Sequence, residues 1–150
     1  MARVKRALLI AIPLVAFIAV AFLVARWLNN DSAERAAVEE LLKAQIAGDA
    51  PRMLRRLECA DEACAEVVRA NARRLKTDGE LKIALYQSQT AHAPRSRTKP
   101  TRVVWYTDPD NTIVQCVLVR RTGDILAGTS VSLLRLSAPI GREASCPKLR

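Results

Sequence analysis

Apolar and polar positions divide the chain into three segments with different periodicities. Residues 7–25, ALLIAIPLVAFIAVAFLVA, form one uninterrupted apolar run. Between residues 31 and 75 the apolar positions recur every three or four residues, which is the spacing of amphipathic helices. From residue 80 onward they recur at every second position, as in half-buried β-strands. The pattern therefore predicts one apolar helix, then amphipathic helices, then a sheet.

The middle segment predicts three amphipathic helices. The first takes Asp31 as its N-cap and ends at Gly48, and we expect it to follow almost directly from the apolar run. Asp49 begins a short second helix, APRMLRRL. A third runs from Cys64 to Leu75, beyond a turn that contains the sequence CADEAC.

Four strands are expected in the last segment. Their alternating apolar residues are Leu81, Ile83 and Leu85; Val103 and Trp105; Val114, Cys116 and Leu118; and Ile125, Ala127, Val131 and Leu133. The third strand is apolar on both faces, which predicts a central position in the sheet. HAPRSRTKP, residues 92–100, is expected to be a polar loop between the first two strands. Helices followed by an antiparallel meander predict an α+β fold in which the helices cover one face of the sheet.

The apolar run has the length of a membrane anchor. A transmembrane helix needs roughly 20 apolar residues. Arg3, Lys5 and Arg6 precede the run and only Arg26 follows it, which by the positive-inside tendency places the N-terminus in the cytoplasm. We therefore expect a cytoplasmic segment at 1–6, a single-pass anchor at 7–28 with Trp27 at the interface, and an extracytoplasmic domain at 29–150.

A cleaved signal peptide is the alternative for the same segment. The sequence AVA at residues 19–21 has the small-residue pattern of a cleavage site. It is followed by FLVARWL, which continues the apolar run beyond the roughly 7–15 residues of a secretory core. We therefore favour an uncleaved anchor.

The four cysteines all follow the apolar run, so a domain outside the cytoplasm would hold them where disulfides form. Three pairings are possible. We favour Cys59 with Cys64, across a break between two helices, and Cys116 with Cys146. A zinc site has little support because no C-x-x-C spacing is present and His92 is the single histidine.

The net charge excludes few functions when the basic residues that flank the apolar run are not counted. The chain has 24 Lys and Arg against 15 Asp and Glu, and four of the basic residues flank the apolar run, which leaves a net charge of about +5 on the remainder. Single-strand nucleic-acid binding requires aromatic stacking platforms, and only Tyr86, Trp105 and Tyr106 lie beyond residue 29. We therefore expect no nucleic-acid partner.

The segment AAVEELLKAQIAGDAPRMLRRL, followed by four strands, resembles the cystatin-like cone of the nuclear-transport-factor-two-like superfamily. The resemblance rests on an amphipathic helix, then Gly48-Asp49, then a short helix with Met53-Leu54, and covers roughly Ala33 to Leu136. It implies a curved four-stranded sheet covered by about three helices. With an N-terminal anchor, the chain is similar to the Mce-associated membrane proteins of actinobacteria and to membrane-anchored scaffold subunits of conjugation and secretion machines.

Catalytic candidates are few. Enzymes on this cone place an Asp or His with a Tyr inside the pocket, whereas His92 here falls in a polar loop, and Asp108 and Asp110 fall in a turn around Pro109. No phosphate-binding glycine loop or nucleophile elbow is present. We expect a protein that is not an enzyme and has no cofactor. The candidate pocket residues are Tyr86, Trp105 and Gln115, the last because it interrupts the alternation of Ile113 and Val117.

These observations lead to two hypotheses. The first is a non-catalytic interaction or scaffold module, anchored in the cell membrane, with protein partners in an envelope assembly for transport or secretion. The second is a module that binds a lipid or another small apolar ligand inside the cone, which predicts an apolar cavity between sheet and helices.

Overall fold

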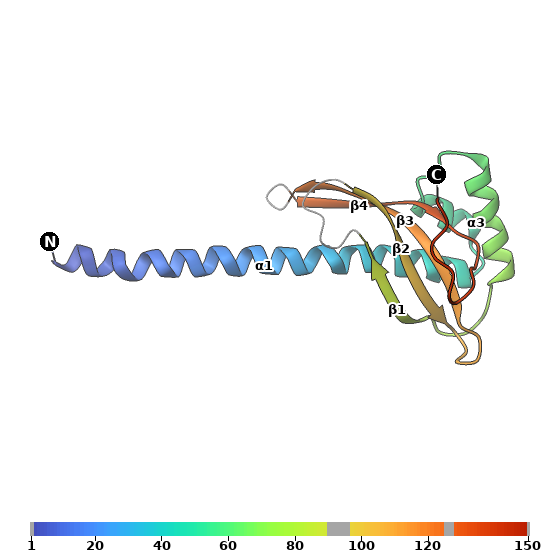
Figure 1. Ribbon diagram of the computed structural model, residues 1–150, viewed down its shortest axis with the longest axis horizontal. Coiled ribbons are helices and arrows are strands. Elements are labelled where there is room, and N and C mark those ends of the chain that lie inside the picture. Colours follow the sequence, from blue (N-terminus) through green and yellow to red (C-terminus); the bar gives the residue numbers. More distant parts are fainter. Residues whose placement is uncertain (1, 90–96, 125–127, 150) are drawn as a thin grey trace.

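A long helix leads into an α+β domain (Figure 1). The structure is a computed structural model that describes the backbone of residues 2–89, 97–124 and 128–149, and the side chains of residues 12–25, 32–89, 97–123 and 130–149. The element order is α1 (Ala2–Ile46), α2 (Ala50–Arg56), α3 (Glu62–Arg74), β1 (Lys82–Ser88), β2 (Arg97–Tyr106), β3 (Ile113–Asp124) and β4 (Gly128–Leu136). This confirms the predicted α+β class and the order of helices before strands.

The helix α1 is one continuous element of 45 residues. Its first part projects away from the domain and its last part packs beneath the sheet (Figure 1). The expectation that the first amphipathic helix follows directly from the apolar run is correct, but the prediction of an N-cap at Asp31 is wrong. No proline or glycine lies between Pro13 and Gly48, so nothing in that stretch interrupts the helical hydrogen bonds.

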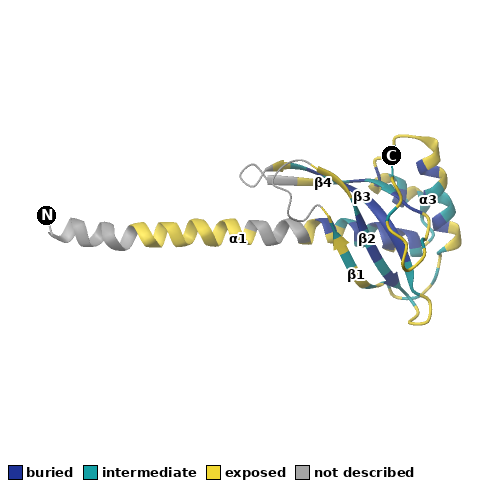
Figure 2. Ribbon diagram, viewed as in Figure 1, coloured by how far each residue is buried: buried dark blue, intermediate teal, exposed yellow. Residues whose placement is uncertain are grey.

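Part of the predicted anchor at 7–28 falls outside the described side chains, namely residues 7–11 and 26–28. In the described part of the chain, no helix is long and apolar enough to span a membrane. The apolar side chains from Ile12 to Val24 are exposed, with Phe17 reaching 72% (Figure 2).

Local capping explains where the helices end and begin. Gly48 adopts φ +73° just after α1, and its amide donates to the carbonyl of Gln45 at 2.9 Å. The Asp49 carboxylate then accepts from the amide of Arg52 at 2.8 Å and caps α2. In the same way the Asp61 carboxylate caps α3. The predicted start of the second helix at Asp49 and the predicted helix break between Cys59 and Cys64 are therefore confirmed.

The four strands form one antiparallel sheet in the order β1-β2-β3-β4. Each strand pairs with its neighbour in sequence, and β3 lies between β2 and β4, as predicted from its two apolar faces. On the inner face, Val103 and Trp105 of β2 lie beside Gln115 and Ile113 of β3 in register. The helices cover this face.

The segment predicted as a polar loop at 92–100 is partly strand. β2 begins at Arg97, and residues 97–100 pair with β3 up to Arg121. The prediction failed because Arg97, Thr98 and Lys99 are exposed and carry no apolar alternation. β1 ends opposite Thr101, so residues 97–100 of β2 have β3 as their single described partner strand. Pro100 lies in this part, and proline is tolerated in a strand that forms an edge. Residues 90–96, including His92, lie outside the described residues.

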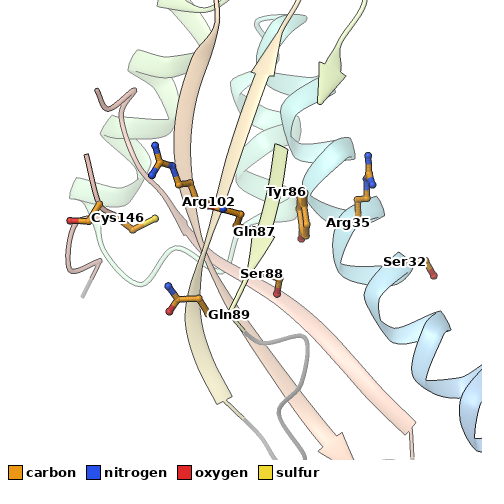
Figure 3. Close-up of a pocket in the computed structure, with 9 residues that line it drawn as sticks. Ser32, Arg35, Tyr86, Gln87, Ser88, Gln89, Arg102 and Cys146 are labelled. Carbon is orange, nitrogen blue, oxygen red and sulfur yellow. The ribbon is translucent and has the colours of Figure 1, made fainter. Parts of the chain in front are cut away.

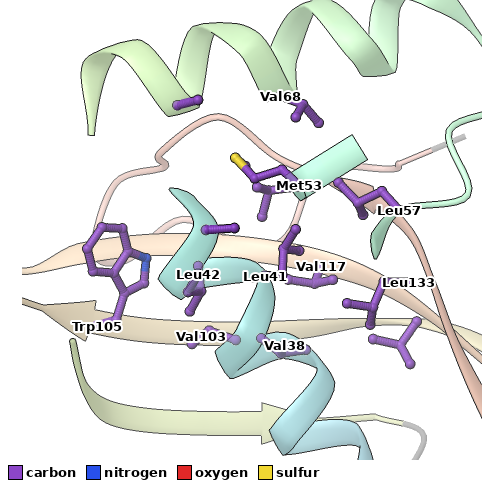
Figure 4. Packing of buried hydrophobic residues seen from close by; sticks show 14 residues of the cluster. Val38, Leu41, Leu42, Met53, Leu57, Val68, Val103, Trp105, Val117 and Leu133 are labelled. Carbon is purple, nitrogen blue, oxygen red and sulfur yellow. The ribbon is translucent and has the colours of Figure 1, made fainter. Parts of the chain in front are cut away.

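The core lies between α1, α2, α3 and the inner face of the sheet (Figure 4). Its fully buried side chains include Val38, Leu41 and Leu42 of α1, which follow one stripe of the helix. They pack with the buried cluster members Met53, Leu57, Val68, Val103, Trp105, Val117, Val119, Leu133 and Leu136. The same helix that carries the exposed apolar run thus supplies the centre of the core.

Candidate functional site

A buried carboxylate on α1 joins the helix to three strands. The side chain of Glu34 has no exposed surface. Its Oε2 accepts from Arg121 Nε at 2.8 Å and lies 2.7 Å from Arg121 Nη2. Its Oε1 accepts from the hydroxyl of Tyr86 at 2.8 Å and from the hydroxyl of Thr101 at 2.7 Å. We call these four residues the Glu34 cluster.

The carboxylate of Glu34 is buried, so its charge needs compensation from its partners in the Glu34 cluster. A buried charge is tolerated when an opposite charge and hydrogen bonds compensate its lost hydration. Glu34 receives both, because the side chain of Arg121 is itself only 7% exposed. The two oxygens of Glu34 are engaged by donors from β1, β2 and β3. The cluster therefore fixes the position of α1 against the sheet and leaves this carboxylate no vacant oxygen for a reaction.

A second buried polar network contains two of the candidate pocket residues. Gln115 Oε1 accepts from Trp105 Nε1 at 2.9 Å and from Gln45 Nε2 at 2.9 Å. Gln115 Nε2 donates to the carbonyl of Ser137 at 3.0 Å. The Asn71 side chain donates to that same carbonyl at 2.9 Å. Gln115 thus joins α1, β2 and the segment after β4 inside the core.

The structure does not bring Tyr86, Trp105 and Gln115 together around one pocket. Trp105 and Gln115 are fully buried and bonded to each other, whereas Tyr86 is partly exposed and belongs to the Glu34 cluster. The space between helices and sheet, where an apolar ligand would lie, is occupied by core side chains such as Leu41, Leu42 and Trp105 (Figure 4). This packing argues against an apolar ligand inside the domain.

The larger of the described cavities lies at the edge of the sheet, beside β1 (Figure 3). Its volume is about 830 Å³, and its lining consists of Ser32, Arg35, Tyr86, Gln87, Ser88, Gln89, Arg102, Ser145 and Cys146. Two of these residues are arginines and none is acidic. We call this cavity the β1 groove. Its walls are α1 on one side and the C-terminal segment on the other, with β1 and β2 between them.

The two predicted disulfides are present. Cys59 is bonded to Cys64, with their Cα atoms 5.6 Å apart, and Cys116 is bonded to Cys146, with their Cα atoms 5.7 Å apart. The first closes the turn before α3. The second holds the C-terminal segment against the outer face of β3, and thereby builds the wall of the β1 groove that contains Cys146.

The described side chains offer few candidates for acid–base catalysis or metal binding. Within them, no group of three or more His, Cys, Asp or Glu residues is arranged to hold a metal ion. The pKa of the Glu40 carboxyl lies below its ordinary value, because partial burial, which raises it, is outweighed by the charges and hydrogen bonds of Lys43 and Arg52. Glu40 lies on the surface of α1 in ion pairs, outside the β1 groove. The residues Asp108 and Asp110 form a turn, in which Asp108 Oδ1 accepts from the amide of Asp110 at 3.2 Å.

Comparison with known proteins adds no relative. No protein-family model, curated protein or solved structure matches the chain.

Sequence reasoning missed Glu34, Arg121, Arg35 and Arg102. For Glu34 and Arg121, the periodicity of buried positions contains a signal. Position 34 falls on the same helical stripe as Val38, Leu41 and Gln45, and Arg121 continues the alternation of Val117 and Val119 along β3. A charged residue on a buried stripe predicts a buried partner, although not which one. For Arg35 and Arg102, no comparable signal is visible in the sequence.

Proposed function

We propose that the chain is a single-pass, membrane-anchored protein whose α+β domain lies outside the cytoplasm and acts as a non-catalytic interaction or scaffold module of a cell-envelope assembly. The observation that carries the proposal is α1. It is one helix that is apolar and exposed over residues 12–25 and forms the centre of a folded core over residues 34–45.

The exposed half of α1 requires an apolar environment. Nine large apolar side chains between Ile12 and Val24 are 40–72% exposed. A helix that is apolar all round is stable in a protein core or in lipid. No other described element packs on this part of α1 (Figure 2). Lipid covers such a surface at no cost to the fold, and the apolar run that continues from residue 7 has the length for it.

The two disulfides and the flanking charges support the orientation. Disulfides persist in oxidising compartments outside the cytoplasm, and both bonds lie in the domain beyond the apolar run. The basic residues Arg3, Lys5 and Arg6 precede the run, as expected for a cytoplasmic N-terminus. A domain after the anchor then lies on the other side of the membrane.

An interaction role is favoured over ligand binding because of how the domain is packed. Its described interior is filled by core side chains, and the larger of the two described cavities, the β1 groove, opens at a sheet edge. Among the described residues beyond the apolar run, the most exposed large apolar side chain is Leu85 of β1, at 44%. The resemblance to the cystatin-like cone, and through it to Mce-associated proteins and secretion scaffolds, supports the same role.

Membrane association and partner binding can be tested together on the full chain. We would express it in a bacterial host, extract membranes with alkaline carbonate, and crosslink intact cells before purification. The proposal predicts that the chain resists extraction and is crosslinked to a reproducible set of envelope proteins. A variant with Leu14, Phe17 and Val20 replaced by Lys should be extracted. Each lysine raises the free energy of inserting the helix into the bilayer by roughly 2.5–3.5 kcal/mol.

The control is Leu85→Lys, which places a lysine on an exposed apolar position of the domain and should remain in the membrane fraction. A chain that carbonate releases as readily as the triple-lysine variant would contradict the proposed anchor. A membrane-bound chain without a reproducible crosslinked partner would contradict the interaction role.

A further inference from the structure

The strand β1 has a second edge, on the side away from β2. Among the described residues, β1 pairs with β2 alone and forms the end of the sheet. Its first half is irregular, with a shift of register between Ile83 and Leu85. Such bulges protect an edge from unwanted pairing. The second half, from Leu85 to Ser88, pairs regularly with β2, and its residues Tyr86, Gln87 and Ser88 line the β1 groove. The regular second half is therefore better suited than the irregular first half to pair with a further strand.

The two arginines of the groove lie on opposite faces of the sheet edge (Figure 3). Tyr86 points to the helix face, where its hydroxyl reaches Glu34, and Arg35 comes from α1 on that face. Gln87, the next residue of β1, lies opposite Arg102 on the other face. There Arg102 donates to the carbonyl of Arg142 in the C-terminal segment.

This placement determines what kind of ligand can use both arginines. A small anion binds on one face and cannot contact both. An extended peptide beside β1 can, because its successive side chains point alternately to the two faces while its backbone pairs with the strand edge. Two adjacent acidic side chains would then meet Arg35 on one face and Arg102 on the other.

The charges of the groove define the partner further. No described carboxylate lies within ion-pair distance of Arg35 or Arg102, and Arg102 Nε is a buried donor without a described partner. Glu34, which accepts from the groove residue Tyr86, is already paired with Arg121. A second copy of this chain is a poor match, because its own β1, KIALYQS, carries a lysine and no acid.

We infer that the second half of β1 binds an extended acidic segment of a partner protein by strand addition, with adjacent acidic side chains paired to Arg35 and Arg102. This inference rests on the proposed interaction role and names the class of partner that the module takes. Backbone pairing supplies part of the affinity, and the two charge-assisted contacts supply the selectivity.

Fluorescence anisotropy on the full chain in a neutral detergent tests the inference. The probe is labelled acetyl-Thr-Val-Glu-Asp-Val-Thr-amide, and the charge control has Gln-Asn in place of Glu-Asp. The acidic probe should bind at least tenfold more tightly than the neutral one. Arg35→Gln and Arg102→Gln should each weaken its binding about tenfold, whereas Arg73→Gln, an equal charge change on the exposed surface of α3, should leave it within twofold. Arg35 is exposed, so its substitution tests the groove without disturbing the core.

Backbone methylation separates strand addition from simple charge attraction. N-methyl groups on the second and fourth residues of the probe, or on the third and fifth, block the two alternate sets of amides. Strand addition predicts that one set abolishes binding and the other does not. Equal effects of the two sets, equal binding of acidic and neutral probes, or an equal effect of Arg73→Gln would overturn the inference.

Two further probes exclude other anionic ligands. Inorganic phosphate and phosphatidylglycerol micelles should compete with the peptide no better than phosphatidylcholine micelles do at equal ionic strength. Competition that depends on Arg35 or Arg102 would instead assign the groove to a phosphate group. Because the chain is in detergent in each assay, a negative result concerns the groove alone, and failure of the membrane proposal would leave peptide binding unchanged.

Discussion

Glu34 and Arg121, which are 87 residues apart, form a buried ion pair in which Arg121 Nε donates to Glu34 Oε2 at 2.8 Å. Glu34 lies on α1, nine residues after the exposed apolar stretch ends at Ala25, and Arg121 lies near the far end of β3. The pair connects the sheet directly to the helix that we propose to be the anchor. A force or a tilt on that helix would therefore be transmitted to the strands.

Removing the charge of Glu34 should destabilise the domain strongly. Glu34→Gln leaves Arg121 buried without a counter-charge, and we expect a loss of about 3–5 kcal/mol in the free energy of unfolding. Urea denaturation of the full chain in neutral detergent measures it. Glu34→Gln combined with Arg121→Met removes both charges and should recover most of the loss. Glu66→Gln, on the exposed surface of α3, is the control. A double variant no more stable than Glu34→Gln would contradict this account.

Gln115 should be required as a hydrogen-bonding group. Gln115→Leu removes the acceptor of Trp105 Nε1 and the partner of Gln45. Buried groups left unpaired cost about 1–3 kcal/mol each, so we expect a loss of about 3 kcal/mol. In a Trp27→Phe background, Trp105 fluorescence follows the unfolding. Gln45→Leu with Gln115→Leu should lose less than the sum of the single variants. Strict additivity would show that the two amides act independently.

The two disulfides should contribute unequally to stability. A disulfide stabilises the fold by lowering the entropy of the unfolded chain, and more so for a longer loop. This effect is about 3.5 kcal/mol for the bond between Cys116 and Cys146 and about 2 kcal/mol for the bond between Cys59 and Cys64. We therefore expect the paired serine substitution at Cys116 and Cys146 to lower the urea midpoint more. Equal midpoints for the two paired variants would contradict this ranking.

Gly48 should resist substitution because of its backbone. At φ +73° an alanine is strained by about 1–2 kcal/mol, and its Cβ would lie 2.9 Å from Cδ of Lys76, which can move aside. The control is Gly141→Ala, whose Cβ would meet nothing closer than 3.9 Å. Thermal unfolding should show a lower midpoint for Gly48→Ala alone. Similar midpoints for the two variants would mean that the turn after α1 adapts.

The features that the sequence predicted correctly depend on neighbouring residues. The start of the second helix at Asp49, the alternation along β3, and the turn between Cys59 and Cys64 are local, so their residue types and spacing are sufficient. Asp31 shows the limit of such reasoning, because a residue suited to capping has no such role where the preceding residues are also helical.

The features that the sequence did not predict depend on tertiary contacts. The sequence shows Gln115 as a polar residue on an apolar face and suggests a pocket position, whereas it lies in the core with partners, Gln45 and Trp105, that come from other elements. The β1 groove is formed by α1, β1, β2 and the C-terminal segment, and the sequence does not show that they meet. Its arginines therefore remained indistinguishable from ordinary surface residues.

A reporter fused after Arg150 shows on which side of the membrane the α+β domain lies. Alkaline phosphatase folds into an active enzyme outside the cytoplasm, and a fluorescent protein that matures in the cytoplasm serves as its counterpart. For a domain outside the cytoplasm, we expect high phosphatase activity in the carbonate-resistant membrane fraction and a dark fluorescent fusion. A bright fluorescent fusion with inactive phosphatase would place the domain in the cytoplasm and overturn the proposed orientation.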